Sequence, residues 1–265
     1  MTAPATGRGT KDFVLDAVHG YPRREELGLE SYETRGVFNS EMAAILAVST
    51  ALDIDLFVES GRARGQSTRI LAKYLAANGV ELHSFERARN ADTEHADRQL
   101  AGAPNTTLHF GDARLAIPAL LAATGAKRIA VLIDGPKGRK ALDLLDATRA
   151  ANPNVIVGFV HDLSRREDGH PNYARRAAEA DYPNGFFTDD EDFVAATRHL
   201  DTDISTVNQG TDWQPYRMGG HDLGSYGPTV GIFRFDGVPA PSPLARRWTA
   251  LRRAVGQVVV ERFGG

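Results

Sequence analysis

The sequence predicts a doubly wound α/β fold built around a mostly parallel, Rossmann-like sheet of seven strands. Short apolar runs alternate with longer amphipathic segments between residues 52 and 162, and Gly or polar residues separate them. Parallel strands need crossovers of a dozen or more residues, usually helices, so this alternation is typical of right-handed βαβ units. A chain of 265 residues is also long enough to bury the core that such a fold needs.

The segment FNSEMAAILAVSTAL, residues 38–52, is expected to form a helix ahead of the first strand. Met42, Ile45 and Leu46 recur at helical spacing on one face, and Asn39 or Ser40 is suited to the N-cap. We therefore expect residues 1–51 to form a helical cap on the sheet.

Five strands and four helices follow in alternation. The expected strands are residues 55–60, 80–87, 106–113, 128–134 and 154–162. The expected helices are residues 67–79, 91–101, 115–125 and 139–151. Residues 52–162 are thus predicted to form the ligand-binding core of the protein.

The alternation ends after Asp162, where a polar stretch begins. Helices are expected at residues 173–180 and 191–200, and two late strands at residues 203–210 and 229–237, paired as an antiparallel hairpin. We assign residues 163–238 to substrate-side segments and late strands.

Residues 239–265 are expected to end the chain with a helix. Leu244, Trp248, Leu251 and Val255 recur at helical spacing, and the arginines between them are expected to form the solvent-facing side. The stretch VPAPSP links this helix to the core. We predict one domain over residues 1–265, with additions at both ends.

The composition of the chain limits the classes of molecule that it is expected to bind. The chain carries 31 basic and 34 acidic residues, a net charge of −3, so no overall field attracts nucleic acid or an anionic membrane. The absence of Cys excludes disulfides, zinc-thiolate sites and thiol nucleophiles, and it agrees with a cytoplasmic protein. No signal-peptide pattern opens the sequence, and no apolar stretch is long enough to span a bilayer. We expect a small-molecule partner, with the chain ends as contact surfaces for a homo-oligomer.

Acidic or Gly-rich turns end the first three strands of the core. The first strand runs into ESGRARG, where Gly61 and Gly65 let the backbone approach a ligand at a helix N-terminus. Glu86 ends the second strand, at the spacing where a carboxylate accepts both hydroxyls of a ribose, and Asp112 ends the third. Because ligands of open parallel sheets bind beyond the carboxyl ends of the strands, we expect a nucleoside cleft there.

The next two strand ends predict a metal site. Asp134 ends the fourth strand, and His161 with Asp162 ends the fifth, so the three side chains are expected to converge. Lys137, three residues after Asp134, would reach over them, and a neighbouring cation would bring its amine toward the range of a general base.

These motifs together resemble the class I S-adenosylmethionine-dependent methyltransferases, over about residues 38–163. The resemblance implies that the Gly-rich turn lines the methionine part of the cofactor, that Glu86 binds the ribose, and that Asp112 with Ala113 binds the adenine edge. The implied residues of the turn are Glu59, Gly61, Ala63, Gly65 and Ser67. Ala63 stands where the family usually has a glycine.

The motifs D-G-P-K, residues 134–137, and H-D, residues 161–162, resemble those of the cation-dependent O-methyltransferases of the catechol and caffeoyl-coenzyme A type. Sugar O-methyltransferases of natural-product pathways carry similar acidic strand ends. The resemblance implies Asp134 and Asp162 as metal ligands, His161 in the remaining ligand place, and Lys137 as the base. Imidazole suits Mn²⁺, Fe²⁺ or Zn²⁺ better than Mg²⁺, so either the ion differs or His161 is itself the base and no metal binds.

The expected activity is methyl transfer from S-adenosylmethionine to a hydroxyl of a small molecule, with Mg²⁺ or Mn²⁺ as the expected metal. Three alternatives stay open: a metal-independent methyltransferase, a nicotinamide-dependent oxidoreductase that uses the same cleft, and a binding module without catalysis. A dinucleotide would favour closely spaced glycines and would meet like charge at Glu59. Single residues also have purely structural explanations: Asp134 can start a turn, Lys137 can be solvated, and His161 can be a packed histidine.

Overall fold

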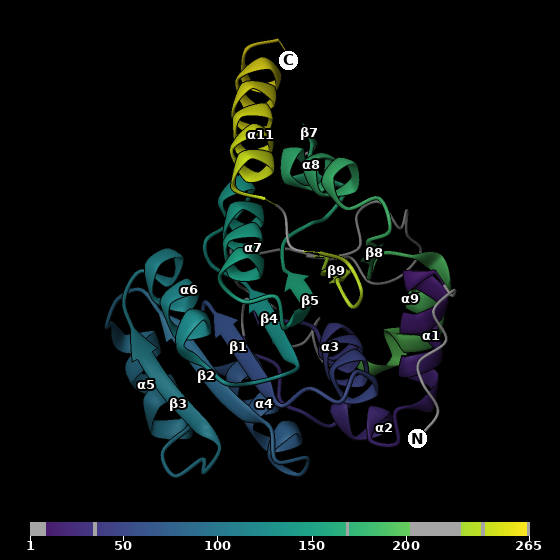
Figure 1. The fold of residues 1–265 in the computed structure, drawn as a ribbon. Helices are drawn as coiled ribbons and strands as arrows, with labels where there is room; N and C mark the ends of the chain where they lie inside the picture. The colour runs from purple at the N-terminus through teal and green to yellow at the C-terminus, as the bar shows by residue number, and fades with distance from the viewer. Residues whose placement is uncertain (1–8, 34–35, 168–169, 202–228, 240–241, 264–265) are drawn as a thin grey trace.

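The structure is a computed structural model that describes residues 9–33, 36–167, 170–201, 229–239 and 242–263. A seven-stranded sheet lies at its centre with helices on both faces (Figure 1). The strand order is β3-β2-β1-β4-β5-β9-β8, and the five strands from β3 to β5 are parallel. This arrangement confirms the predicted doubly wound fold class.

The parallel strands are β1 (Leu56–Ser60), β2 (Glu81–Glu86), β3 (Thr106–Phe110), β4 (Ile129–Ile133) and β5 (Val155–Val160). At the other edge, β9 (Gly231–Arg234) runs antiparallel to β5, and β8 (Phe186–Phe187) runs antiparallel to β9. A separate two-stranded sheet pairs β6 (Arg166–Glu167) with β7 (His170–Pro171).

The helices of the N-terminal part and the core are α1 (Thr10–Gly20), α2 (Arg24–Leu27), α3 (Asn39–Ala51), α4 (Gln66–Ala76), α5 (Ala91–Gln99), α6 (Ala113–Ala123) and α7 (Arg139–Ala151). Later in the chain come α8 (Tyr173–Asp181), α9 (Glu191–Thr197), the 3₁₀ helix η1 (Arg198–Asp201) and α11 (Pro243–Phe263). None of the helices in the described ranges has the length and apolar character needed to cross a bilayer.

The two faces of β4 show how the sheet divides the core. Ala130 and Leu132 belong to the apolar cluster formed with α3, α4 and α5, whereas Val131 and Ile133 belong to the cluster formed with α6, α7 and α8. All five residues of β4 are fully buried. A strand covered on both faces needs apolar side chains at every position, which explains why this strand appears in the sequence as a continuous apolar run.

The N-terminal helix α3 is more deeply buried than its sequence pattern predicts. Every residue from Asn39 to Ser49 is buried, because α1, α9 and η1 cover the sides that the sheet and α4 leave open. The N-cap is Phe38 and neither Asn39 nor Ser40, so the predicted cap is wrong by one or two residues. The Phe38 amide donates to the Glu41 carboxylate, and the first-turn amide of Ser40 donates to the Asp201 carboxylate at 2.9 Å in place of a side-chain cap.

The region after Asp162 differs in part from the prediction. Helix α8 and the strand at residues 231–234 are confirmed, and the helix expected at residues 191–200 ends as the 3₁₀ helix η1. The partner of β9 at the sheet edge is β8, which no expectation covered, because two residues are too short for a period-2 pattern. The strand expected at residues 203–210 lies outside the described residues.

The C-terminal helix α11 extends away from the sheet, and its arginine side is not wholly exposed (Figure 1). Arg253 is 2% exposed and bonds to Asp143 and Asp181, with Asp146 at 3.1 Å. Leu244, Trp248, Leu251 and Val255 are all more than half exposed instead. The expectation of a fully wet arginine face is therefore wrong, because ion pairing to α7 and α8 holds this helix more than apolar packing does.

Candidate functional site

A cavity of about 330 Å³ opens at the carboxyl ends of the strands from β3 to β4. Four of the predicted cofactor residues line it: Gly61, Glu86, Asp112 and Ala113. The remaining lining residues are Ser60, Phe85, Arg87, Gly111, Arg114, Gly135, Pro136 and Lys140. We call this cavity the cleft. Its volume and its position at the strand ends suit a nucleoside-sized ligand.

Gly61 permits the close approach of two strand ends at the floor of the cleft. Its φ is +94°, and a Cβ there would lie 2.7 Å from the backbone nitrogen of Gly135. Any side chain would therefore push the turn after β1 away from the turn after β4. The glycine joins the cleft to the strand end that carries Asp134.

Glu59 lies beneath the Gly-rich turn and does not line the cleft. Its side chain is fully buried, and its carboxylate accepts bonds from the hydroxyls of Ser67, Thr68 and Ser84. Burial raises the pKa of Glu59, and the three hydroxyl donors oppose that effect. These contacts tie β1 to β2 and to the start of α4, so the carboxylate supports the turn from below.

Glu86 lines the cleft, but its carboxylate also holds the turn. One oxygen accepts the backbone amides of Arg62 and Ala63 at 3.1 and 2.9 Å, and the other accepts the amide of Arg87 at 2.6 Å. Three backbone donors are thereby satisfied by one side chain. A ribose that binds at Glu86 would have to share this carboxylate with the turn.

The other predicted residues of the turn lie away from the cleft. Ala63 adopts a φ of +43° within the turn. Gly65 faces α5, where a Cβ would lie 2.8 Å from that of Ala96, and the Ser67 hydroxyl is engaged by Glu59. These three residues are not among those that line the cleft, and their contacts shape and pack the turn.

Asp112 is the N-cap of α6 at the mouth of the cleft. Its carboxylate accepts the backbone amide of Arg114 at 3.0 Å and pairs with the guanidinium of the same residue. The side-chain hydrogen bond from Arg114 lowers the pKa of Asp112 to about 2. With Arg87 and Lys140 also lining the cleft, Asp112 faces several cations that the sequence motifs did not indicate.

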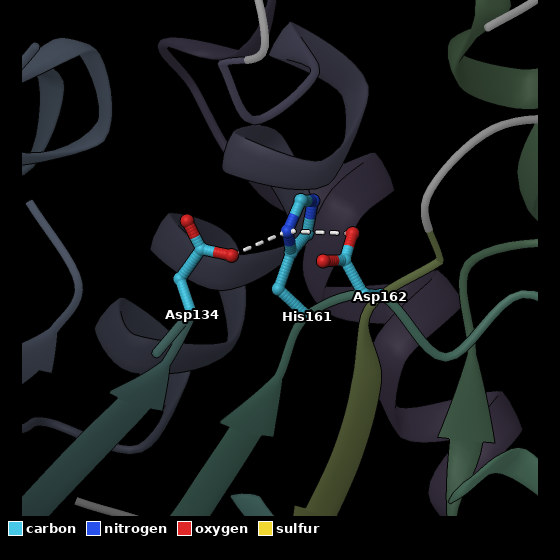
Figure 2. Close-up of side chains that lie close together, drawn as sticks. All are labelled: Asp134, His161 and Asp162. Atoms are coloured by element: carbon cyan, nitrogen blue, oxygen red, sulfur yellow. Dashed lines mark hydrogen bonds and ion pairs between the residues drawn. The ribbon is translucent and has the colours of Figure 1, made fainter. Parts of the chain in front are cut away.

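Asp134, His161 and Asp162 come together at the ends of β4 and β5 (Figure 2). We call these residues the trio. One ligand atom from each lies within 4.8 Å of the other two. His161 Nδ1 is 2.6 Å from an oxygen of Asp134 and 3.3 Å from an oxygen of Asp162. Asp162 has a φ of +60°, a left-handed conformation that Asp tolerates better than most residues.

Lys137 reaches the trio from the turn after β4, as its spacing predicted. Its ammonium nitrogen contacts the carboxylate of Asp134 and lies 2.6 Å from an oxygen of Asp162. Burial alone would lower the pKa of Lys137, but the two carboxylates raise it above its ordinary value. The amine is thus held in its charged form, whereas the sequence led us to expect a weakened base.

His161 is 5% exposed, and its second ring nitrogen faces a residue that the sequence analysis missed. Glu41 of α3 is 2% exposed, and one of its oxygens lies 3.4 Å from His161 Nε2. A glutamate inside an otherwise apolar helix was the available signal, because a carboxylate is seldom buried without a partner. Which strand end it would face depends on the tertiary packing of α3.

The charged groups of the trio and its neighbours shift one another's pKa values. Burial alone would raise the pKa of Asp134, but His161 and Lys137 lower it to about 2. Burial would lower the pKa of His161, yet Asp134, Asp162 and Glu41 raise it well above its usual value. Burial raises the pKa of Glu41, and His161 opposes this shift. The carboxylates of the trio are thus stabilised by positive charge on both sides.

The donor set of the trio fits a divalent cation. Two carboxylates and one imidazole converge, and oxygen ligands with a single nitrogen suit Mn²⁺, Fe²⁺ or Zn²⁺ better than Mg²⁺. Asp134 and Asp162 would supply oxygen, and His161 would supply Nδ1. The same carboxylates now contact the Lys137 ammonium, so this amine would have to move aside for an ion.

A second cavity, of about 290 Å³, lies between α7, α8, β9 and α11. It is lined by residues such as Tyr182, Phe233 and Arg253, and none of the predicted site residues borders it. The predicted site residues therefore lie in the cleft, in the trio or in the Gly-rich turn beside them, at the carboxyl edge of the sheet.

No family model and no curated protein sequence matches the chain. Among solved structures, the chain is similar to the O-methyltransferase TomG of Streptomyces achromogenes, which is involved in tomaymycin synthesis and was solved in complex with S-adenosylmethionine. The two are 15% identical, and the match covers 83% of this chain and 89% of that chain at a TM-score of 0.45. The S-adenosylhomocysteine-bound methyltransferase PaMTH1 of Podospora anserina is 9% identical, with 88% and 98% covered at a TM-score of 0.43. We assign the fold from the chain's own strand order.

Proposed function

We propose that the protein is an S-adenosylmethionine-dependent O-methyltransferase that methylates a hydroxyl of a small molecule with the help of a divalent cation. The observation that carries this proposal is the position of the trio directly beside the cleft. Asp134 ends β4, and the next two residues, Gly135 and Pro136, line the cleft. A cofactor in the cleft and an acceptor at the trio would therefore be neighbours.

Methyl transfer needs an acceptor oxygen held in line with the sulfonium carbon. The bond between sulfur and the methyl carbon breaks while the bond between that carbon and the acceptor oxygen forms, and the hydroxyl proton leaves to a base. A divalent cation supplies Lewis acidity, which lowers the pKa of a hydroxyl that it binds. The chain's own contribution is to fix Asp134, Asp162 and His161 on strand ends, which hold their positions better than a loop would.

Lys137 is the side chain best placed to accept the proton. The Lys137 side chain is about half exposed, whereas both nitrogens of the buried His161 already face carboxylates. Positive charge placed between Asp134 and Asp162 would compete with the ammonium and lower the pKa of Lys137. His161 then acts as a ligand, and Lys137 as the base.

A metal-independent methyltransferase is the second candidate, and the contacts of Lys137 favour it. The ammonium already bridges the two carboxylates that would otherwise bind the ion. In that case the cation of the site is the Lys137 ammonium. His161, whose pKa the surrounding carboxylates raise, would have to release its own proton before it could act as the base.

Calorimetry with S-adenosylhomocysteine, Mn²⁺ and NADH tests the proposal. We expect the wild type to bind S-adenosylhomocysteine and Mn²⁺. We expect Asp134→Asn to lose Mn²⁺ binding and to keep its affinity for S-adenosylhomocysteine. Binding of NADH without S-adenosylhomocysteine would contradict the proposal and indicate an oxidoreductase. Methylation of a panel of hydroxylated acceptors that survives a chelator would indicate the metal-independent enzyme. Binding of the nucleoside without turnover of any acceptor would indicate a binding module.

A further inference from the structure

We propose that Glu41 is the positioning residue of the trio: it holds a proton on His161 Nε2, so that Nδ1 is the atom offered to a metal. This inference rests on the metal-assisted form of the proposed function. It assigns a role to a residue of α3 that lies 120 positions before His161 in the chain.

Glu41 is a buried carboxylate, and the hydrogen bonds assigned to its side chain come from donors in the described part of the chain. The Phe38 amide donates to Oε2 at 3.0 Å. The Thr188 hydroxyl lies 3.4 Å from Oε1, and its oxygen already accepts the Val230 amide at 3.0 Å, so its single proton is free to point at Glu41. A carboxylate that is nearly inaccessible to water needs such donors, because an unpaired buried charge is costly.

His161 Nε2 is the third group that faces this carboxylate. It lies 3.4 Å from Oε2, an ion-pair distance, and within the described part of the chain it is a buried nitrogen with no assigned hydrogen bond. An ionised carboxylate only accepts, so a nitrogen placed against it carries the proton. Because both ring nitrogens face carboxylates, the metal-free ring carries hydrogen on both. A metal at Nδ1 would displace the hydrogen there, and Glu41 would keep the one on Nε2.

The opposite nitrogen of His161 points into the trio. Nδ1 is 2.6 Å from Asp134 and 3.3 Å from Asp162, as the dashed lines in Figure 2 show. In a neutral imidazole with hydrogen on Nε2, the lone pair lies on Nδ1. A metal-binding histidine commonly donates its other N–H to a carboxylate, which fixes the ring and raises its basicity as a ligand. The geometry of Glu41 matches that arrangement.

The first test compares Mn²⁺ affinity, measured by electron paramagnetic resonance with Mn²⁺ alone as the probe. We expect Glu41→Gln to lower the affinity by about 10- to 100-fold, which is the usual cost of removing such a partner. Glu30→Gln is the matched control. Glu30 is also a buried glutamate of the N-terminal region, but it bonds to Arg69, Lys73 and Tyr74 and not to the trio. Its variant should bind Mn²⁺ like the wild type, and equal affinity in the folded Glu41→Gln variant would overturn the inference.

The second test needs no loss of activity, and its one variant, His161→Gln, serves only to assign a signal once it has been shown to fold. In ¹⁵N NMR of the metal-free wild type, we expect a slowly exchanging proton on His161 Nε2, with the signal assigned by its absence in His161→Gln. After Zn²⁺ is added, the Nε2 proton should stay and the Nδ1 shift should change. A zinc-bound Nε2, or an Nε2 proton that exchanges as fast as that of an exposed histidine, would overturn the role of Glu41.

The two tests separate this inference from the proposed function. A wild type that binds neither Mn²⁺ nor Zn²⁺ would remove the metal from the proposed function, and the exchange rate of the Nε2 proton would then decide alone whether Glu41 holds the ring. A wild type that binds metal through Nε2 would keep the proposed function and reject the role given to Glu41.

Discussion

The acidic residues at the strand ends form two groups that use their carboxylates differently. At β1 and β2, Glu59 and Glu86 accept hydrogen bonds from hydroxyls and backbone amides of the turn that they adjoin. At β4 and β5, the carboxylates of the trio face an imidazole and an ammonium instead. The first group accepts hydrogen bonds that the folded backbone and nearby hydroxyls need, whereas the second group forms ion pairs with the imidazole of His161 and the ammonium of Lys137.

This difference shows that an acidic residue at a strand end is not in itself a functional signal. A carboxylate that accepts bonds from the backbone stabilises a turn, and its loss is felt as lost stability. A carboxylate that faces charged side chains at an open edge can exchange those partners for a ligand. The contacts of each group, and not its position in the motif, indicate which role it has.

Asp134→Asn should give the largest effect and act on function. The variant keeps the shape of the side chain but removes the charge that faces His161 and Lys137, so we expect methyl transfer to fall by about 10²- to 10³-fold. Turnover with a radiolabelled methyl donor measures this, with circular dichroism as the check on folding. Activity near the wild-type level would show that the trio is structural.

Glu59→Gln should act on stability first. The amide puts a donor where three hydroxyls now find acceptors, so we expect the free energy of unfolding to fall by about 2 to 3 kcal/mol. Urea denaturation measures the change. A variant as stable as the wild type would contradict the supporting role of Glu59, and a loss of cofactor binding without a loss of stability would place its carboxylate in the cleft after all.

The dependence of stability on acid pH should show the contribution of the trio. The pKa of Asp134 is lowered to about 2 from its ordinary value of 3.8, so its stabilising contribution is complete above that ordinary value and is lost as the pH falls through about 2. The contribution is on the order of 2 kcal/mol. We would measure the free energy of unfolding at several values between roughly pH 5 and pH 2, the range in which such a carboxylate loses its contribution. This free energy should fall more steeply with decreasing pH for the wild type than for Asp134→Asn. Parallel curves would show that Asp134 is not paired as described.

Glu86→Gln should give the smallest effect. Its amide oxygen can keep the Arg62 and Ala63 amides, but the amide nitrogen can no longer accept the Arg87 amide, so we expect a loss of about 10-fold in affinity for S-adenosylhomocysteine. Calorimetry measures it, and Glu81→Gln, a change at the start of the same strand, is the control. A loss far greater than this would indicate that Glu86 contacts the ligand more than it contacts the turn.

Much of the fold and part of the site could be predicted from the chain. Residues 52–162 alternate so regularly because each strand is covered on both faces and each crossover is a helix, and both properties are local enough to leave a pattern. The convergence of Asp134, His161 and Asp162 was also predictable, since neighbouring parallel strands end at one edge. Two-residue β8 and the burial of Arg253 were not, because neither leaves a periodic signal.

What the sequence by itself determined is the succession of strands and helices along the core and the side chains at the strand ends, since hydrophobic period and crossover length depend on neighbours in the chain. Only the tertiary structure decided what those side chains contact. Glu59 turns beneath β1 to hydroxyls of α4 and β2, and Glu41 meets His161 across 120 residues, because burial forces every polar group to find a partner wherever the packing brings one. Contacts that arise from packing join residues far apart in the sequence, so a local sequence motif does not contain them.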